Sequence, residues 1–299
     1  MASTALIRAA LPSEPELQSF ACAAAQLLID RQARVPGART VARRAGIGIQ
    51  HFDHRDYAPG DDVRHIDWRQ TARFRRPIVR RFESESVSDW SLLVDASSSM
   101  AVHEAAKARA AVRMAAALAY ALLHLGHRVE VLAFGGRVVA HCPRGRGQHH
   151  YAEIARLLTA LRPPPSGERS ELGVCVRHVH GAASAFVVGD FLADDEMCRD
   201  LGALRQRCTA LHAMQVSDGA ETRLVEAGEF DLVDVETASR MHAVAGEHAN
   251  ESATRKRAAM TGRLESFCAR SGVAFSDWDV SRPWQPVLLA HLLRARSHC

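Results

Sequence analysis

The sequence lacks the long apolar run that a membrane span requires. A transmembrane helix needs about 20 consecutive, mainly apolar residues, and no stretch of this 299-residue chain approaches that length. The N-terminus also lacks a charged segment followed by a short apolar one, the pattern of a secretory signal peptide. We therefore expect a soluble, cytoplasmic protein without a transmembrane segment.

Paired cysteines and zinc-binding spacings are missing as well. The seven cysteines are odd in number, form no Cys-x-x-Cys pair and lie mostly in apolar runs, which indicates reduced, buried thiols. The 16 histidines include three close groups: His51 with His54, His149 with His150, and His178 with His180. None of these groups has a matching cysteine or a His-Glu-x-x-His arrangement. We expect most histidines to be exposed or half-buried.

The motifs of two enzyme classes are also absent. There is no Gly-x-Ser-x-Gly nucleophile elbow and no Gly-x-x-x-x-Gly-Lys-Ser phosphate loop, so the chain is not expected to hydrolyse ATP by itself. The net charge of +4 permits an anionic partner without requiring one. Because no nucleic-acid-binding motif occurs, we expect no nucleic-acid partner.

What the sequence does contain is a pattern of alternating strands and helices. Hydrophobic residues make up 47% of the chain, enough for a packed core. Strands are expected at 92–94, 129–134, 137–142, 185–188, 210–216 and 273–275. Helices are expected at 16–33, 105–125, 151–161, 170–180, 195–208, 252–271 and 284–296. This predicts an α/β fold with a doubly wound, mostly parallel sheet.

Two segments depart from this alternation. Residues 1–88 are expected to form a small N-terminal region, and residues 89–299 the α/β domain. Within that domain, short strands with a turn predict a β-hairpin insertion at about 222–248.

The helix at 105–125 is Ala-rich, and its polar positions include Lys107.

The first predicted strand of the domain ends in an oxygen-rich turn. Asp95, Ser97 and Ser99 follow the apolar residues 92–94 at alternate positions. Doubly wound domains place ligands at the carboxyl ends of their strands, and oxygen-only ligands suit Mg²⁺ or Mn²⁺. The alternative is that the two serines merely cap the next helix.

A second carboxylate is expected beside this turn. Asp190 ends the strand at 185–188, and it converges with Asp95 if the two strands are neighbours in a parallel sheet. The alternative for Asp190 is a helix cap or a turn residue.

Several motifs together resemble the DUF58 family, which pairs a short N-terminal region with a von Willebrand factor A-like domain. The match runs from Tyr57-Ala-Pro-Gly-Asp-Asp-Val-Arg-His-Ile-Asp-Trp68 through Ala72-Arg73 and 79–83 to Val94-Asp-Ala-Ser-Ser-Ser-Met100. The signature residues are Tyr57, Pro59, Gly60, Asp61, Asp62, Arg64, Asp67 and Trp68. The Asp-x-Ser-x-Ser turn resembles the metal-ion-dependent adhesion site (MIDAS) of von Willebrand A domains.

The resemblance implies both a site and partners. It implies a third loop with a threonine hydroxyl, and Ser170 stands at the matching place; Ser170 could equally cap the following helix. Arg169, next to it, would repel a cation. Members of this family are commonly encoded beside MoxR-type AAA+ ATPases, which implies an adaptor or chaperone role in maturing a client such as methanol dehydrogenase or another metalloenzyme.

Rival interpretations remain open at this stage. The same metal could activate water in a hydrolase such as a phosphatase or nuclease, or the protein could be a structural adaptor that needs no metal. A structural network that ties the N-terminal region to the sheet is expected from a charged cluster of six residues: Arg64, Asp67, Trp68, Arg73, Arg80 and Glu83. A basic face for nucleic acid is the less favoured interpretation of that cluster.

Overall fold

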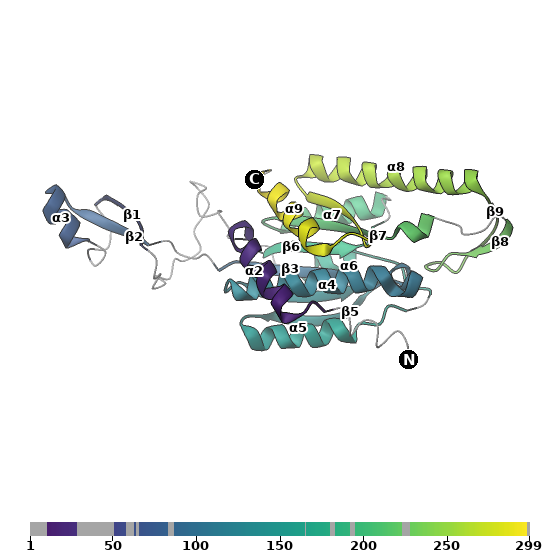
Figure 1. The fold of residues 1–299 in the computed structure, drawn as a ribbon, viewed down its shortest axis with the longest axis horizontal. Helices are drawn as coiled ribbons and strands as arrows, with labels where there is room; N and C mark the ends of the chain where they lie inside the picture. The colour runs from purple at the N-terminus through teal and green to yellow at the C-terminus, as the bar shows by residue number, and fades with distance from the viewer. Residues whose placement is uncertain are drawn as a thin grey trace. The chain divides into compact units, whose positions relative to one another are not determined.

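The computed structural model describes residues 11–28, 51–57, 63, 66–82, 87–164, 166–179, 183–191, 195–222 and 228–297. Contacts divide the chain into two units (Figure 1). The larger unit is Met1–Leu28 with Ser88–Cys299, and the smaller unit is Ile29–Val87. This differs from the expected division, which placed residues 1–88 together, because the helix Glu14–Leu28 (α2) packs on helices of the larger unit.

A six-stranded sheet forms the centre of the larger unit, in the order β10-β7-β6-β3-β4-β5 within the described residues. Its strands are β3 (Asp89–Asp95), β4 (Arg128–Phe134), β5 (Val138–Gly145), β6 (Ala183–Gly189), β7 (Leu211–Ser217) and β10 (Ala274–Asp279). All neighbours pair in parallel except β4 and β5, which form an antiparallel hairpin at one edge. The predicted mostly parallel α/β sheet is confirmed.

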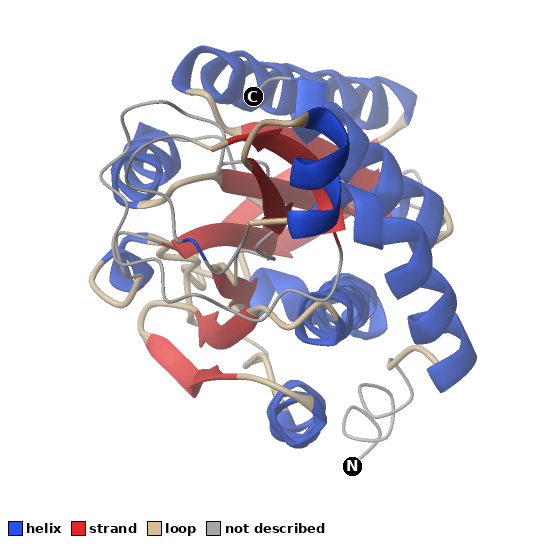
Figure 2. Cartoon of the chain, turned by 90° about the vertical axis from the view of Figure 1, so that its left-hand side faces the viewer, coloured by secondary structure: helices blue, strands red, loops and turns tan. Residues whose placement is uncertain are grey.

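Helices cover both faces of this sheet (Figure 2). Side chains on one face pack with α2, α4 (Val102–His124), α5 (Gln148–Ala160) and α9 (Trp284–Ser297). Those on the other pack with α6 (Gly173–Val176), α7 (Asp195–Arg207) and α8 (Glu247–Ser271). Strand β3 shows why: Leu92 and Val94 belong to the first core and Leu93 to the second, as alternation along a strand requires.

The order of the strands creates a switch point beside β3. From β3 the chain continues to β4 on one side, and later returns to β6 on the other. Crevices at such switch points, outside the carboxyl ends of the strands, are where doubly wound folds bind ligands. The Ala-rich helix α4 follows β3 directly and is buried along most of its length, because it contacts the sheet, α2, α5 and α9.

Two small antiparallel sheets complete the structure. The predicted hairpin insertion is confirmed as β8 (Gly228–Val233) paired with β9 (Arg240–Ala245). In the smaller unit, β1 (His51–Asp56) pairs with β2 (Ile78–Phe82) around α3 (Trp68–Phe74). Short 3-10 helices occur at η3 (Ser98–Ala101) and η4 (Gly219–Thr222). In the described residues, no helix has the length and apolarity needed to cross a bilayer.

Most predicted elements are present with shifted ends, and one is much shorter. The helix expected at 170–180 is reduced to the single turn Gly173–Val176. The residues before it instead form an extended loop that lies against the end of β3, because its polar groups bond to the Asp95 turn, as described below.

Candidate metal centre

The turn after β3 turns its oxygens toward one another. Asp95 is the last residue of β3, and its Oδ1 accepts a hydrogen bond from the Ser97 backbone N–H at 2.8 Å. The Oγ atoms of Ser97 and Ser99 lie 3.0 Å apart. Ser97 stands at the N-cap of η3 without a capping hydrogen bond from its side chain, and the N-cap of α4 is Ala101, so the capping alternative is wrong for this turn. The hydroxyls are left facing each other, as a shared ligand would need.

The loop before α6 is fastened to the same turn. The Ser170 hydroxyl donates to Oδ2 of Asp95 at 2.7 Å. Ser98 and Glu168 exchange two further bonds: the Ser98 N–H donates to the Glu168 carbonyl, and the Glu168 N–H donates to the Ser98 hydroxyl, both at 3.0 Å. The N-cap of α6 is Leu172, so Ser170 is not the cap that the sequence allowed.

Asp190 lies at the end of the neighbouring strand, as expected. Strands β3 and β6 pair in parallel, and Asp190 directly follows β6. Gly189 makes the close approach possible, because a Cβ there would stand 2.7 Å from the Asp95 Cβ. The structure therefore brings Asp95, Ser97, Ser99, Ser170 and Asp190 to one edge of the sheet.

The sequence analysis did not identify Lys107 as a positively charged side chain at this end of the sheet. The ammonium of Lys107, on the first turns of α4, lies 2.6 Å from Oδ2 of Asp190 and also pairs with Glu221. Lys107 is only 3% exposed, so these are buried ion pairs. Its position in an amphipathic helix pattern suggested an exposed polar face, and only the fold shows that this face meets Asp190.

Within the part of the chain that the structure describes, the Asp95 carboxyl group forms no ion pair of the kind that Lys107 makes with Asp190 and Glu221. Burial, and then the charge of Asp190, raise its pKa to about 7, although bonds from Ser170 and Ser97 act in the opposite direction. Burial lowers the pKa of Lys107, but Asp190 and Glu221 outweigh it and the net pKa is raised. At this end of the sheet, the Asp190 carboxylate is therefore neutralised by Lys107, whereas the Asp95 carboxylate has no neighbouring positive charge of this kind.

The β8–β9 hairpin contributes a third acid that the sequence did not suggest. The Glu236 carboxylate accepts a hydrogen bond from Ser99, and burial raises its pKa. The hairpin is attached by the Gly167 N–H, which donates to the Val235 carbonyl at 2.8 Å. Residues of the two loops and of α7 enclose a cavity of about 40 Å³: Arg169, Ser170, Asp190, Glu196, Met197, Asp200 and Glu236.

These donors fit a hard divalent cation. Carboxylate and hydroxyl oxygens are what Mg²⁺ and Mn²⁺ prefer, and a cation would supply the positive charge that Asp95 needs. Asp95, Ser97, Ser99 and Ser170 could bind it directly. Asp190, already paired with Lys107, is better suited to contact it through water. Arg169 lines the cavity, and its positive charge acts to lower the pKa of Glu236. Part of the Arg169 charge is therefore balanced by the Glu236 carboxylate of the hairpin.

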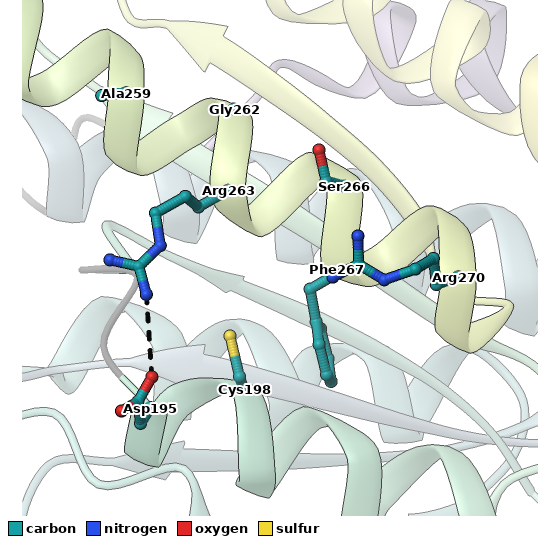
Figure 3. A pocket seen from close by; sticks show the side chains of 8 residues that line it. All are labelled: Asp195, Cys198, Ala259, Gly262, Arg263, Ser266, Phe267 and Arg270. Carbon is teal, nitrogen blue, oxygen red and sulfur yellow. Dashed lines mark ion pairs between the residues drawn. The ribbon is translucent and has the colours of Figure 1, made fainter.

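A larger hollow lies away from this edge, between α7 and α8 (Figure 3). It measures about 510 Å³. Its walls are the facing side chains of the two helices, including Cys198 and Phe267. An Asp195–Arg263 ion pair of 3.7 Å joins α7 to α8 there (Figure 3). It brings together no set of acids and hydroxyls comparable to the Asp95 turn, so volume alone does not make it the functional site.

Three of the signature residues of the smaller unit can be placed. The Tyr57 N–H donates to the Pro77 carbonyl, and the Asp67 carboxylate caps α3 by accepting from two backbone N–H groups at 3.1 Å. Trp68 is 68% exposed, so it is not part of a buried core. The remaining signature residues lie outside the described residues: Pro59, Gly60, Asp61, Asp62 and Arg64.

Comparison with known families identifies the family of this chain. A family model described as "Protein of unknown function DUF58" matches residues 53–264. The chain belongs to the DUF58 family. Among its relatives are uncharacterized proteins of Mycobacterium tuberculosis (Rv1480) and Mycobacterium bovis (Mb1516), each 30% identical over 198 residues. The match covers 64% of this chain and 62% of either relative, so this DUF58 chain spans less than two thirds of their length.

Solved structures give only a distant likeness. BatB of Bacteroides thetaiotaomicron matches with a TM-score of 0.41 and 10% identity, over 70% of this chain and 99% of that one. An aerotolerance-related membrane protein of Bacteroides fragilis matches with a TM-score of 0.39 and 9% identity, over 69% of this chain and 99% of that one. Neither likeness assigns a function to this DUF58 protein.

Proposed function

We propose that this DUF58 protein is a non-catalytic module that binds partner proteins through a divalent cation. The supporting observation is the Asp95 carboxylate, buried among the hydroxyls of Ser97, Ser99 and Ser170 at the switch point of the sheet. Mg²⁺ or Mn²⁺ held there keeps at least one position for a ligand from outside the chain. An acidic side chain of the partner takes that position, as in the MIDAS that the Asp95 turn resembles.

The position of Glu236 supports an acidic partner. Its carboxylate already rests on Ser99, so this edge accepts a carboxylate delivered by a separate loop. From the family resemblance, the partner is a MoxR-type AAA+ ATPase in the cytoplasm. The adaptor then couples the ATPase to a client during its maturation or assembly, with a metalloenzyme such as methanol dehydrogenase as the example.

Calorimetric titration of Mg²⁺ and Mn²⁺ tests the metal step. Wild type is compared with Asp95→Asn, which keeps the size of the side chain and removes its charge, and with Asp195→Asn, a matched control at an exposed acid. We expect saturable binding by wild type and the control, and affinity at least about tenfold weaker in Asp95→Asn. Equal heats from all three proteins would refute the metal site.

One observation favours a second candidate, a structural adaptor that works without metal. Lys107 already neutralises Asp190 from within the chain, so part of the site is satisfied by protein groups alone. Capture of the ATPase partner that survives EDTA would select this candidate. A metal-dependent hydrolase is the third outcome, and turnover of phosphate esters or nucleic acid with Mn²⁺, lost in Asp95→Asn, would select it.

A further inference from the structure

A second cluster of metal-binding side chains lies at the antiparallel edge of the sheet. Cys142 is on β5, and His150 and Glu153 are on α5, which packs beside it (Figure 1). One ligand atom from each residue lies within 4.8 Å of the others. The cluster is separate from the Asp95 turn. Asp95 follows the central strand β3, whereas β5 is the outermost strand of the described sheet and pairs only with β4.

The hydrogen bonds of His150 fix which ring nitrogen is available. Its Nε2 lies 2.8 Å from the Val129 carbonyl oxygen, which can only accept, so Nε2 carries the hydrogen. Metal-binding histidines commonly donate their second N–H to a backbone carbonyl in this way. In the neutral ring, Nδ1 then presents a lone pair.

That lone pair faces a second acceptor. Nδ1 of His150 lies 3.2 Å from Oε2 of Glu153. Two acceptors at this distance repel each other unless a positive charge lies between them, either a proton on Nδ1 or a metal ion. His150 is only 7% exposed, and a protonated ring would be a buried cation.

The backbone is shaped around the imidazole ring. A Cβ at Gly145 would stand 2.4 Å from Nδ1 of His150, so only glycine lets the ring lie against the turn between β5 and α5. The buried thiol of Cys142 approaches from β5, and the side chain of Glu153 closes the cluster from the solvent side with 56% exposure. The site is therefore preformed on two sides and open to solvent on the third.

We propose that Cys142, His150 and Glu153 form a zinc site. One sulfur, one nitrogen and one carboxylate oxygen are a donor set for Zn²⁺ rather than for Mg²⁺, which prefers oxygen alone. Three protein ligands leave the fourth tetrahedral position to water or to an external ligand. On binding, the Cys142 thiol gives up its proton to solvent, and the thiolate sulfur coordinates the ion.

This site escaped the sequence analysis because its spacing follows no motif. Seven residues lie between Cys142 and His150, and they span a strand end, a Gly-containing turn and a helix start. Only the packing of α5 against β5 brings the thiol to the ring.

Cobalt substitution tests the proposal on the full chain. Metal-stripped protein is titrated with Co²⁺, whose bond to a thiolate gives a near-ultraviolet charge-transfer absorption, and Zn²⁺ is then added as competitor. We expect one Co²⁺ per chain with this absorption, and its displacement by Zn²⁺. Oxygen ligands at the Asp95 turn give no such absorption, so the result does not depend on the proposed function.

Variants make the assignment specific. Cys142→Ser should abolish the absorption, and Glu153→Gln should weaken Co²⁺ binding at least about tenfold. Cys22→Ser and Glu251→Gln, at an exposed thiol and an exposed acid, should match wild type. Glu153 is largely exposed, so its replacement leaves folding intact. Absence of the absorption in wild type, or its persistence in Cys142→Ser, would overturn the zinc site in favour of a protonated His150 paired with Glu153.

Discussion

At the scale of single residues, the most consequential finding is a buried lysine beside the candidate metal centre. The Lys107 ammonium pairs with both Asp190 and Glu221, and all three side chains are at most 15% exposed. Removing one partner of such a cluster is costly because the remaining charges stay buried without compensation.

Replacing this lysine should therefore destabilise the protein. Lys107→Met keeps the apolar stem and removes the ion-pair partner of Asp190, whereas Glu221 keeps its ion pair with Arg257 at 2.8 Å. The buried charge of Asp190 should then cost about 3–5 kcal/mol of unfolding free energy. Chemical denaturation measures it, with Lys256→Met at an exposed position as the control. If Mg²⁺ binds at this edge, it should restore part of the loss. A loss below about 1 kcal/mol would mean that the ion pairs contribute little.

A buried histidine pair predicts how stability depends on pH. Burial lowers the pKa of His212 to about 4 and that of His291 well below its usual value. The rings are 3.2 Å apart between Nδ1 and Nε2, and Arg294 adds positive charge near His291. Since the unfolded chain binds protons near pH 6.5, stability should fall as pH drops from 6.5 toward 4, by about 2 kcal/mol between pH 7 and pH 5 for His212.

The variant comparison isolates this contribution. Asp95 has the opposite effect on the pH dependence of stability: its raised pKa makes the folded state bind a proton that the unfolded chain releases, so its contribution to stability rises as pH falls. Unfolding should therefore be measured at both pH values for wild type, His212→Leu and His149→Gln, the last at an exposed position. His212→Leu should reduce the loss of stability between pH 7 and pH 5 by about 2 kcal/mol and keep the part that His291 contributes, and His149→Gln should keep the full loss. Identical pH profiles would rule out the buried pair as the source.

At the scale of elements, the local patterns predicted most of the sheet and helices, but not the groups that cross between them. Strand β3 and the Asp-x-Ser-x-Ser turn are local features, and the position of Asp190 followed from the parallel pairing of two strands. Lys107 and Glu236 reach the same edge from a helix face and a hairpin tip. No local spacing encodes those contacts, because they depend on how the elements pack.

The hairpin tip gives an element-scale prediction. If Glu236 helps to neutralise the cation, Glu236→Gln should weaken Mg²⁺ binding about tenfold, or 1.4 kcal/mol. Because its carboxylate occupies the place that the proposed function assigns to an acidic side chain of the partner, the same change should strengthen capture of the proposed ATPase partner. Glu229→Gln, on the same hairpin and with a side chain 76% exposed, is the matched control. Weaker partner capture in Glu236→Gln would contradict the idea that the two carboxylates compete.

At the scale of the whole molecule, the division into two units places the Asp95 turn in one unit and the signature residues around Asp67 in the other. The larger unit contains both hydrophobic cores and the Asp95 turn, and the smaller unit carries the signature residues around Asp67. Helix α2 precedes the smaller unit in the chain, yet it packs on α4 and α9, with the Phe20 and Trp284 rings 5.2 Å apart. The smaller unit is therefore an insertion into the larger one.

An insertion of this kind should be removable. Replacing Ile29–Val87 by a long Gly/Ser linker leaves α2 and every strand of the six-stranded sheet in place, and flexible linkers close such a gap at small entropic cost. We expect the shortened protein to unfold cooperatively and to keep wild-type Mg²⁺ affinity, while losing any partner that recognises the signature segment. Calorimetry and partner capture measure the two properties separately. Loss of cooperative unfolding would show instead that the inserted unit is needed for the sheet to fold.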